Sequence, residues 1–340
     1  MTSFKRYFIS HARSDFRPFI YILVTVLAMT LLIGIDAQPI SRFDHVTEEF
    51  VDDYQSTLFL PVTFMCILAY VLPVMEFAFF KKRINLDCAY SLPISRRAMG
   101  LVHYLTGLMM LLIVFSASYL INFLLLLARG PGWFNFLPLI GHYFLCLVLG
   151  FAIYSVLVFV FNEANTMGDG IWFMLLYTFV FILCFGALCE ITDNTGAEIA
   201  EGVYGAIPWG TVDMLTTSYQ YLVEINFAHK AMFWSTTGYV MWFIFWIAAG
   251  IASALGFFFT FGKRRMEKTE EISDSFFGFR VLIPIYAFCG MILFNGSDEF
   301  VFWLIIQVLT ILGYTIYRRG FHYKKDDIAV LCILAFFLFV

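Results

Sequence analysis

Charged residues are scarce in this 340-residue chain. Only 14% of its residues are Asp, Glu, Lys or Arg, whereas soluble domains carry about 25%. Hydrophobic residues make up 61%, and the mean hydropathy is +0.83. This composition excludes a water-soluble fold and makes the lipid bilayer the expected surroundings. The formal net charge is only −4 and no basic patch is present, so we expect no nucleic-acid partner.

Motifs that would carry catalysis are also missing. The chain has no G-x-x-x-x-G-K-[S/T] loop to hold nucleotide phosphates, no G-x-S-x-G and no H-E-x-x-H. The six histidines are scattered, and none pairs with another at i+3 or i+4 on one helix face. The seven cysteines lack paired metal-ligand spacing and are expected to be small buried hydrophobes. We therefore predict a protein that is not an enzyme, with no catalytic residue, metal ligand or directly bound cofactor.

Long apolar runs dominate what is present. A helix needs roughly 20 apolar residues to cross about 30 Å of hydrocarbon, and helices satisfy their own backbone groups there. A further run, 328–340, has only 13 residues and is typical of a span that is cut short, as in a fragment of a longer chain. The fold expected is an all-α polytopic bundle, whose predicted spans are 18–35, 58–80, 101–127, 136–161, 171–188, 232–261, 276–294 and 300–317.

Lysine and arginine predict the orientation of these spans, because loops rich in them stay in the cytoplasm. Four basic residues precede the first span, and segments 81–97, 262–275 and 317–327 carry five, four and four. Segments 36–57 and 190–231 have a single basic residue each, so we expect them outside, with short helices of 190–231 dipping into the outer leaflet. The prediction is a multi-pass plasma-membrane protein with a cytoplasmic N-terminus.

Ionisable residues within a span are costly and mark functional candidates. Glu76 lies about one turn inside the cytoplasmic end of the second span, and Arg280 lies near the start of the seventh. Snorkelling or local pairing at the interface explains each of them more simply than a transport role. His103 and His142 fall on opposite sides of the membrane, which argues against a shared site. Because the central thirds of the spans are almost free of carboxylates, an ion-coupled carrier is disfavoured.

The segment 81–100 (KKRINLDCAYSLPISRRAMG) is the most informative stretch. It begins with basic residues, continues through a short mixed run, and reaches a long apolar helix directly after Ser-Arg-Arg. Pro93 should end any preceding helical turn, and Ser95 could cap the third span. A short helix lying across the ends of two spans is the physical expectation.

On these residues, and on SLPISRR above all, the chain resembles the membrane subunits (permeases) of type-2 ABC exporters. The basic amphipathic stretch 4–19 resembles the interfacial elbow helix of that family, and six spans with a half-apolar outer segment agree with its architecture. The charged run KRRMEKTEEISDSFFGFR resembles a segment of the longer, Firmicute-type permeases. The resemblance covers roughly residues 1–290 and implies a six-span core at 1–261, a charged linker at 262–275 and additional spans at 276–340.

The resemblance also implies a function and partners. The chain would export a hydrophobic or amphipathic substrate, such as a peptide antibiotic, drug or lipid, with a second permease subunit in the bilayer. A separate cytoplasmic ABC ATPase dimer would bind ATP and Mg. An ATP-independent secondary carrier or channel is the alternative, and a membrane-embedded enzyme or sensor is a third possibility. The residues expected to contact the ATPase are Asp87, Tyr90, Leu92, Pro93 and Arg96, with Asn162, Glu163 and Asn165 as a second contact.

Overall fold

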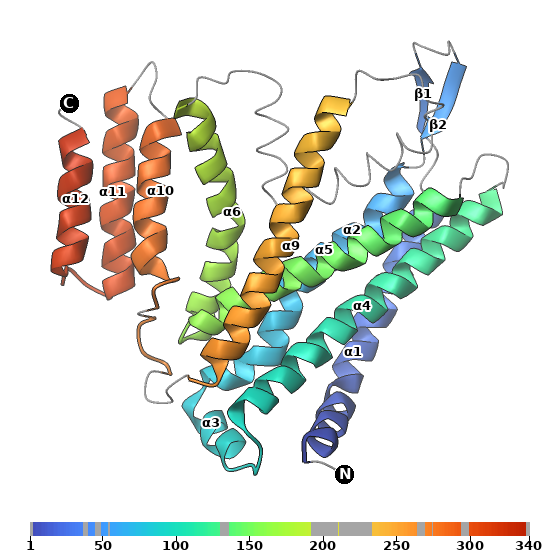
Figure 1. Ribbon diagram of the computed structural model, residues 1–340, viewed down its shortest axis with the longest axis horizontal. Helices are drawn as coiled ribbons and strands as arrows, with labels where there is room; N and C mark the ends of the chain where they lie inside the picture. Colours follow the sequence, from blue (N-terminus) through green and yellow to red (C-terminus); the bar gives the residue numbers. More distant parts are fainter. Residues whose placement is uncertain are drawn as a thin grey trace. The chain divides into compact units, whose positions relative to one another are not determined.

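The computed structural model is a helical protein (Figure 1). It describes residues 3–36, 40–44, 49–53, 55–129, 136–191, 210, 233–263, 269–273, 275–293 and 299–337. The helices agree with the expected all-α bundle, and a short antiparallel hairpin of β1 (Ile40–Asp44) and β2 (Glu49–Asp53) is an addition in the segment after the first helix. The predicted outer-leaflet helices of segment 190–231 fall almost entirely outside the described residues.

The described helices follow the predicted apolar runs closely. In chain order they are α1 (Ser3–Asp36), α2 (Gln55–Phe77), the 3-10 helix η1 (Ala78–Lys81), α3 (Arg83–Tyr90), α4 (Arg96–Arg129), α5 (Phe136–Glu163), α6 (Met167–Ile191), α9 (Phe233–Phe261), α10 (Phe279–Leu293), α11 (Glu299–Arg318) and α12 (Lys325–Phe337).

The N-terminal stretch differs from the expected elbow helix. Residues 4–19 do not form a separate interfacial helix, because α1 continues through them and the first span as one helix of 34 residues with Pro18 inside it. At 1.5 Å per residue such a helix is about 51 Å long, well beyond the thickness of a hydrocarbon core. No glycine before Gly34 interrupts it, and a transmembrane helix tolerates a single proline.

Seven helices, rather than eight, are long and apolar enough to cross a membrane within the described part of the chain. The expected seventh span is shorter than predicted, because α10 has only 15 residues. Residues 276–278 before it form a turn, in which the Gly278 amide donates to the Ser275 carbonyl at 3.0 Å. The chain is thus a multi-pass α-helical membrane protein, with candidate spans Phe4–Ile35, Phe59–Lys81, Arg96–Ala128, Leu139–Glu163, Met167–Leu188, Met241–Phe261 and Val301–Arg318.

The chain forms two compact units that interleave along the sequence. α6 belongs to the same unit as the C-terminal helices. Unit 1 comprises Met1–Glu76, Tyr90–Val158 and Pro208–Lys263, and unit 2 comprises Phe77–Ala89, Phe159–Ile207 and Arg264–Val340.

Unit 1 is built on α4, along which α1 packs (Figure 1). The Thr30 hydroxyl of α1 lies 2.8 Å from the Ser118 hydroxyl of α4, so a polar pair links these two helices in the interior. α9 lies close against α5 at Gly250, where an added Cβ would lie 2.5 Å from Ala152 Cα. Small residues at such crossings let transmembrane helices pack backbone to backbone.

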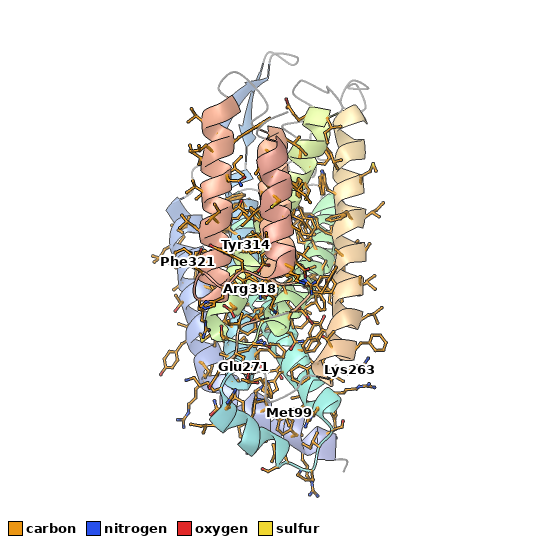
Figure 2. The ribbon with its side chains drawn as sticks, turned by 90° about the vertical axis from the view of Figure 1, so that its left-hand side faces the viewer. Met99, Lys263, Glu271, Tyr314, Arg318 and Phe321 are labelled. Atoms are coloured by element: carbon orange, nitrogen blue, oxygen red, sulfur yellow. The ribbon has the colours of Figure 1, made fainter. Side chains whose placement is uncertain are left out.

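Unit 2 contains α6 with α10, and α11 and α12 follow beside α10 (Figure 1). The Tyr286 hydroxyl of α10 donates to the Leu176 carbonyl of α6 at 2.6 Å. Tyr314 and Arg318 lie one turn apart on α11 (Figure 2), and the guanidinium of Arg318 makes two hydrogen bonds, of 2.8 and 3.0 Å, to Asp327 at the start of α12. A buried ion pair therefore links the last two helices.

Candidate functional site

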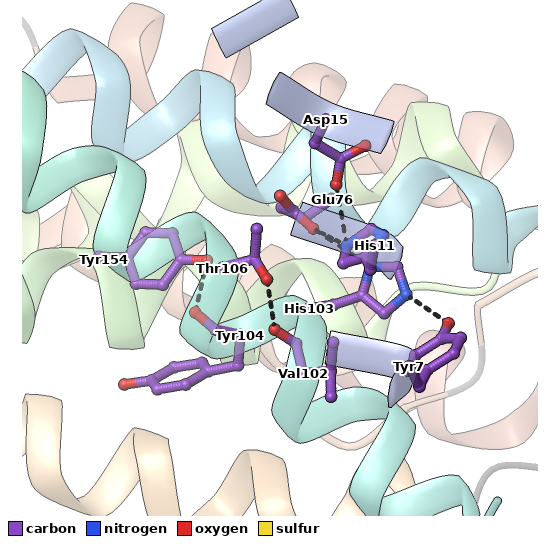
Figure 3. Close-up of polar contacts among 9 residues, drawn as sticks. All are labelled: Tyr7, His11, Asp15, Glu76, Val102, His103, Tyr104, Thr106 and Tyr154. Atoms are coloured by element: carbon purple, nitrogen blue, oxygen red, sulfur yellow. Dashed lines mark hydrogen bonds and ion pairs between the residues drawn. The ribbon is translucent and has the colours of Figure 1, made fainter. Parts of the chain in front are cut away.

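Three helices of unit 1 contribute to a cluster of ionisable side chains (Figure 3). Glu76 lies near the C-terminal end of α2, His103 lies two turns into α4, and His11 lies two turns into α1. One carboxylate oxygen of Glu76, Oε2, lies 2.9 Å from His11 Nε2 and 3.1 Å from His103 Nδ1. Two imidazoles from different helices therefore share one carboxylate oxygen.

Two further side chains of α1 complete the group, which we call the His–Glu cluster (Tyr7, His11, Asp15, Glu76 and His103). The Tyr7 hydroxyl lies 3.2 Å from His103 Nε2, on the far side of that ring from Glu76. Asp15 follows His11 by one turn, and its Oδ2 lies 3.0 Å from His11 Nε2. The cluster is thus a chain of polar groups that runs from Tyr7 through His103, Glu76 and His11 to Asp15.

Burial sets the electrostatic character of the cluster. The side chains of Glu76 and His103 are 4% and 6% exposed, and that of His11 is 14% exposed. The His11 and His103 rings approach to 3.8 Å between centroids. Charges this far from water interact strongly and are costly unless paired. The arrangement therefore holds negative carboxylate oxygens against basic nitrogens in a confined space, a setting suited to binding a cation.

A glycine on α4 makes room for the cluster. An added Cβ at Gly107 would lie 3.1 Å from Glu76 Cγ and would collide with the Tyr154 hydroxyl. That hydroxyl donates to the carbonyl of Tyr104, the residue after His103, at 3.3 Å (Figure 3). Packing around a residue without a side chain brings Glu76 close to α4, and so within reach of His103.

The predicted ATPase-contact segment forms the short helix that the sequence indicates. Asp87 and Tyr90 lie in the second half of α3, and their side chains are outside those described. Leu92 and Pro93 are exposed in the turn that follows, and Arg96 is the exposed first residue of α4. The expected break and cap are confirmed, because α3 ends before Pro93 and the Ala98 amide donates to Ser95 Oγ at 3.3 Å.

The predicted second contact lies in unit 2, at the turn between α5 and α6. Glu163 Oε2 accepts a 2.6 Å hydrogen bond from the Ser275 hydroxyl. The Asn165 amide donates to Ser273 Oγ at 2.7 Å, and its side chain donates to the Ile272 carbonyl at 3.2 Å. Asn162 is buried. In the structure Glu163 and Asn165 thus hydrogen-bond to residues 272, 273 and 275 of their own chain.

Lys81 anchors the same turn. Its ammonium group is almost fully buried and donates to the carbonyls of Phe161, Asn162 and Ala164 at 2.7, 3.3 and 2.5 Å. The carbonyls of Phe161 and Asn162 belong to the last turn of α5 and that of Ala164 directly follows it. Helix carbonyls at this end lack intrahelical donors, and a positive charge is favoured there. Lys81 therefore caps α5 and fixes the position of the turn that carries Asn165.

Sequence reasoning identified Glu76 as an unusual residue but did not find its partners. His11 and His103 are 92 positions apart, so no spacing rule for a single helix connects them. His142 was compared with His103, but the structure places its Nδ1 3.1 Å from the Tyr119 hydroxyl instead. The sequence signal that could have indicated the cluster was the Glu76 carboxylate one turn inside a span, together with histidines near the same predicted membrane face.

Comparison with known proteins yields no family assignment. No protein-family model, no curated protein and no solved structure matches the chain. Its function is therefore argued from its own fold and side chains.

Proposed function

We propose that this protein is the membrane-spanning subunit of an ATP-driven exporter of the type-2 ABC class. A cytoplasmic ATPase dimer, which carries ATP and Mg, would bind the segment 81–100, and a second permease subunit would complete the pathway. The protein would lie in the cell membrane with its N-terminus in the cytoplasm. The observation that carries the proposal is the short helix and exposed turn between two long spans.

Exposed apolar side chains in this segment support a protein partner. Ile84 on α3 is 84% exposed, and Leu92 in the following turn is 40% exposed. They lie between Lys82 and Arg83 on one side and Arg96 and Arg97 on the other, so the positive-inside rule favours water rather than lipid around them. Large apolar side chains exposed to water favour a covering protein surface.

The proposed mechanism is a rigid-body change. ATP binding would close the ATPase pair, and the segments docked on it would move with the ATPases. Because α3 is joined directly to α2 through η1, and the turn 91–95 leads directly into α4, motion of the segment would be transmitted to these two spans. The spans would then pass from an inward-facing to an outward-facing arrangement. A hydrophobic or amphipathic substrate suits spans that are rich in aromatic residues and poor in charge.

Co-purification with the ATPase and its stimulation test this proposal. Replacing Ile84 and Leu92 together by Glu should weaken ATPase binding by about tenfold or more, as expected when anchors of an interface are lost. The matched control is Phe321→Glu, a side chain that is 79% exposed in another basic segment (Figure 2) and that should leave binding unchanged.

Transport in proteoliposomes provides the second measurement. The double replacement Asp87→Ala and Arg96→Ala should uncouple ATP hydrolysis from transport, whereas Arg319→Ala, an exposed basic residue elsewhere, should not. If the permease neither binds nor stimulates an ATPase, or if the double variant transports normally, the exporter proposal fails.

A second candidate function is an ATP-independent carrier or channel. The His–Glu cluster favours it, because a carboxylate and two imidazoles gathered within the candidate spans of the structure are a common mark of an ion pathway. Substrate accumulation in proteoliposomes that contain no ATPase and no nucleotide would support this candidate. Accumulation that requires both would exclude it.

A further inference from the structure

We propose that the His–Glu cluster is a binding site for a divalent transition-metal ion. The ligands would be His11 Nε2, the Glu76 carboxylate and His103 Nδ1, with the Asp15 carboxylate beside them. A resident ion at this position would fasten α1 to α2 and α4. The inference does not depend on the exporter proposal, because it rests on the geometry of unit 1 alone.

The spacing of the donor atoms fits a metal ion. The ligand atoms of His11, Glu76 and His103 lie within 4.8 Å of one another, and Oε2 lies 2.9 and 3.1 Å from the two nitrogens. Donors bound tetrahedrally at about 2.1 Å are about 3.4 Å apart. Small rotations of the side chains would therefore bring the three donors to bonding positions around one ion, with a fourth position left open.

Hydrogen bonding alone leaves a negative oxygen unsatisfied in this cluster. Both Asp15 Oδ2 and Glu76 Oε2 lie within 3.0 Å of His11 Nε2, which carries at most one proton. Asp15 Oδ2 is shielded from water and depends on its 3.0 Å contact with His11 Nε2, for which it competes with Glu76. A carboxylate oxygen shielded from water without a donor is costly, and a nearby divalent cation would offset that cost.

Tyr7 provides the support that a metal-bound imidazole requires. Binding through His103 Nδ1 needs the neutral tautomer with its proton on Nε2, and the Tyr7 oxygen lies 3.2 Å from that nitrogen as an acceptor. A partner on the second ring nitrogen is a regular feature of histidine metal ligands, because it fixes tautomer and ring orientation. With Tyr7 as the acceptor for the Nε2 proton, the His103 Nδ1 lone pair would be available to an ion bound beside Glu76.

The donor types select the class of metal. Two imidazole nitrogens and one carboxylate suit Zn²⁺ and the neighbouring first-row ions, whereas Mg²⁺ and Ca²⁺ prefer sets of oxygen atoms. Zn²⁺ and Co²⁺ are accordingly the probes, and Mg²⁺ is the negative control.

The test uses the full-length protein in mild detergent at neutral pH after treatment with a chelator. We expect titration with Co²⁺ to produce visible d–d absorption that saturates at one ion per chain. We also expect Zn²⁺ to displace the Co²⁺ and to raise the thermal midpoint, because an ion that binds only the folded state stabilises it. Mg²⁺ should do neither.

Variants identify the ligands. His11→Gln and His103→Gln should each abolish the saturable absorption and the Zn²⁺ effect, whereas His142→Gln, a buried histidine of α5 in the same unit, should retain both. His322→Gln should also retain both, since His322 is exposed in unit 2. Tyr7→Phe keeps all ligands and should weaken Co²⁺ binding by about tenfold. Because it is the mildest change, Tyr7→Phe tests the site even if a histidine variant does not fold.

Two results would overturn the proposal. One is the lack of any saturable Co²⁺ absorption in the wild-type protein. The other is binding by a folded His103→Gln or His11→Gln variant that equals that of the wild type, since the ion would then occupy a different place.

Discussion

Glu76 and Lys81 are five positions apart in the sequence, and both are buried charged residues at the end of the same predicted span. Glu76 in unit 1 is surrounded by side chains from α1 and α4, and its carboxylate oxygen is shared by two imidazoles. Lys81 in unit 2 is bound by backbone carbonyls at the end of α5.

The difference between these two environments teaches how to separate a structural charge from a candidate functional one. Backbone carbonyls at a helix end are fixed acceptors that need a donor in every state of the protein. Side chains can rotate, exchange partners and take up an ion. The Lys81 environment is therefore a permanent cap, whereas the His–Glu cluster is made of side chains that could rearrange around an ion.

The largest expected effect breaks the cap. Lys81→Met keeps the length and apolar stem of the side chain but leaves the carbonyls of Phe161 and Ala164 without this donor. We expect a loss of about 3 kcal/mol in the free energy of unfolding, seen as a lower thermal midpoint in detergent. Added Zn²⁺ should raise the midpoints of Lys81→Met and of the wild type equally and so leave the difference between them unchanged, because no metal-ligating side chain is involved.

Lys82→Met is the matched control for this change. Lys82 is the exposed neighbour of Lys81, and its replacement should alter stability by no more than about 0.5 kcal/mol. Equal thermal midpoints for the two variants would show that the bonds to the α5 carbonyls contribute little.

A substitution with an intermediate expected effect tests whether helix packing, in addition to the polar cluster, stabilises unit 1. A Cβ at Gly250 would lie 2.5 Å from Ala152 Cα, so Gly250→Ala should push α9 away from α5. We expect a destabilisation of about 1–3 kcal/mol in thermal unfolding. Gly141→Ala is the control, because a Cβ there meets no described atom within 4 Å. An unchanged midpoint for Gly250→Ala would contradict the close crossing.

The smallest effect concerns a second buried charge in unit 2, Asp327. Burial alone would raise the pKa of the Asp327 carboxyl, but hydrogen bonds from Arg318 and from the Lys324 amide, with their positive charges, lower this pKa below its ordinary value of 3.8. Because this pKa is lowered in the folded state, the ionised carboxylate stabilises the folded state at pH values above the ordinary pKa of 3.8. This contribution is lost as the pH falls through the lowered pKa.

Thermal unfolding against pH measures this contribution. The wild-type protein should be more stable than Asp327→Asn at neutral pH, and the two midpoints should converge below about pH 4. Asp326→Asn is the control, since Asp326 and its partner Arg280 are 66% and 53% exposed and such pairs contribute only about 0–1 kcal/mol. A wild-type advantage that persists in acid would indicate a role for Asp327 other than its charge.

Local structure could be predicted from the sequence wherever one segment contains all the necessary information. The long apolar runs predict the helices, and Pro93 and Ser95 predict the break between α3 and α4 that the structure contains. The length of α1 was not predicted, because amphipathic residues before Pro18 are compatible with both a separate surface helix and a continuous one.

The candidate site could be predicted only in part. An ionisable residue inside a span is visible in the sequence, and Glu76 was recognised on that ground. Its partners depend on which faces of α1, α2 and α4 meet, and on the space that Gly107 leaves for Glu76 and Tyr154. The same holds for Asn165, whose hydrogen bonds to residues more than 100 positions away are made by folding alone.

The sequence by itself determined that this protein is a multi-pass helical membrane protein. Lipid offers no hydrogen bonds, so long apolar segments must form helices regardless of their neighbours. Only the tertiary structure decided that His11, Glu76 and His103 meet, and that Lys81 caps α5. Such contacts depend on helix rotation and close packing between segments distant in the chain, and no local pattern of residues specifies these.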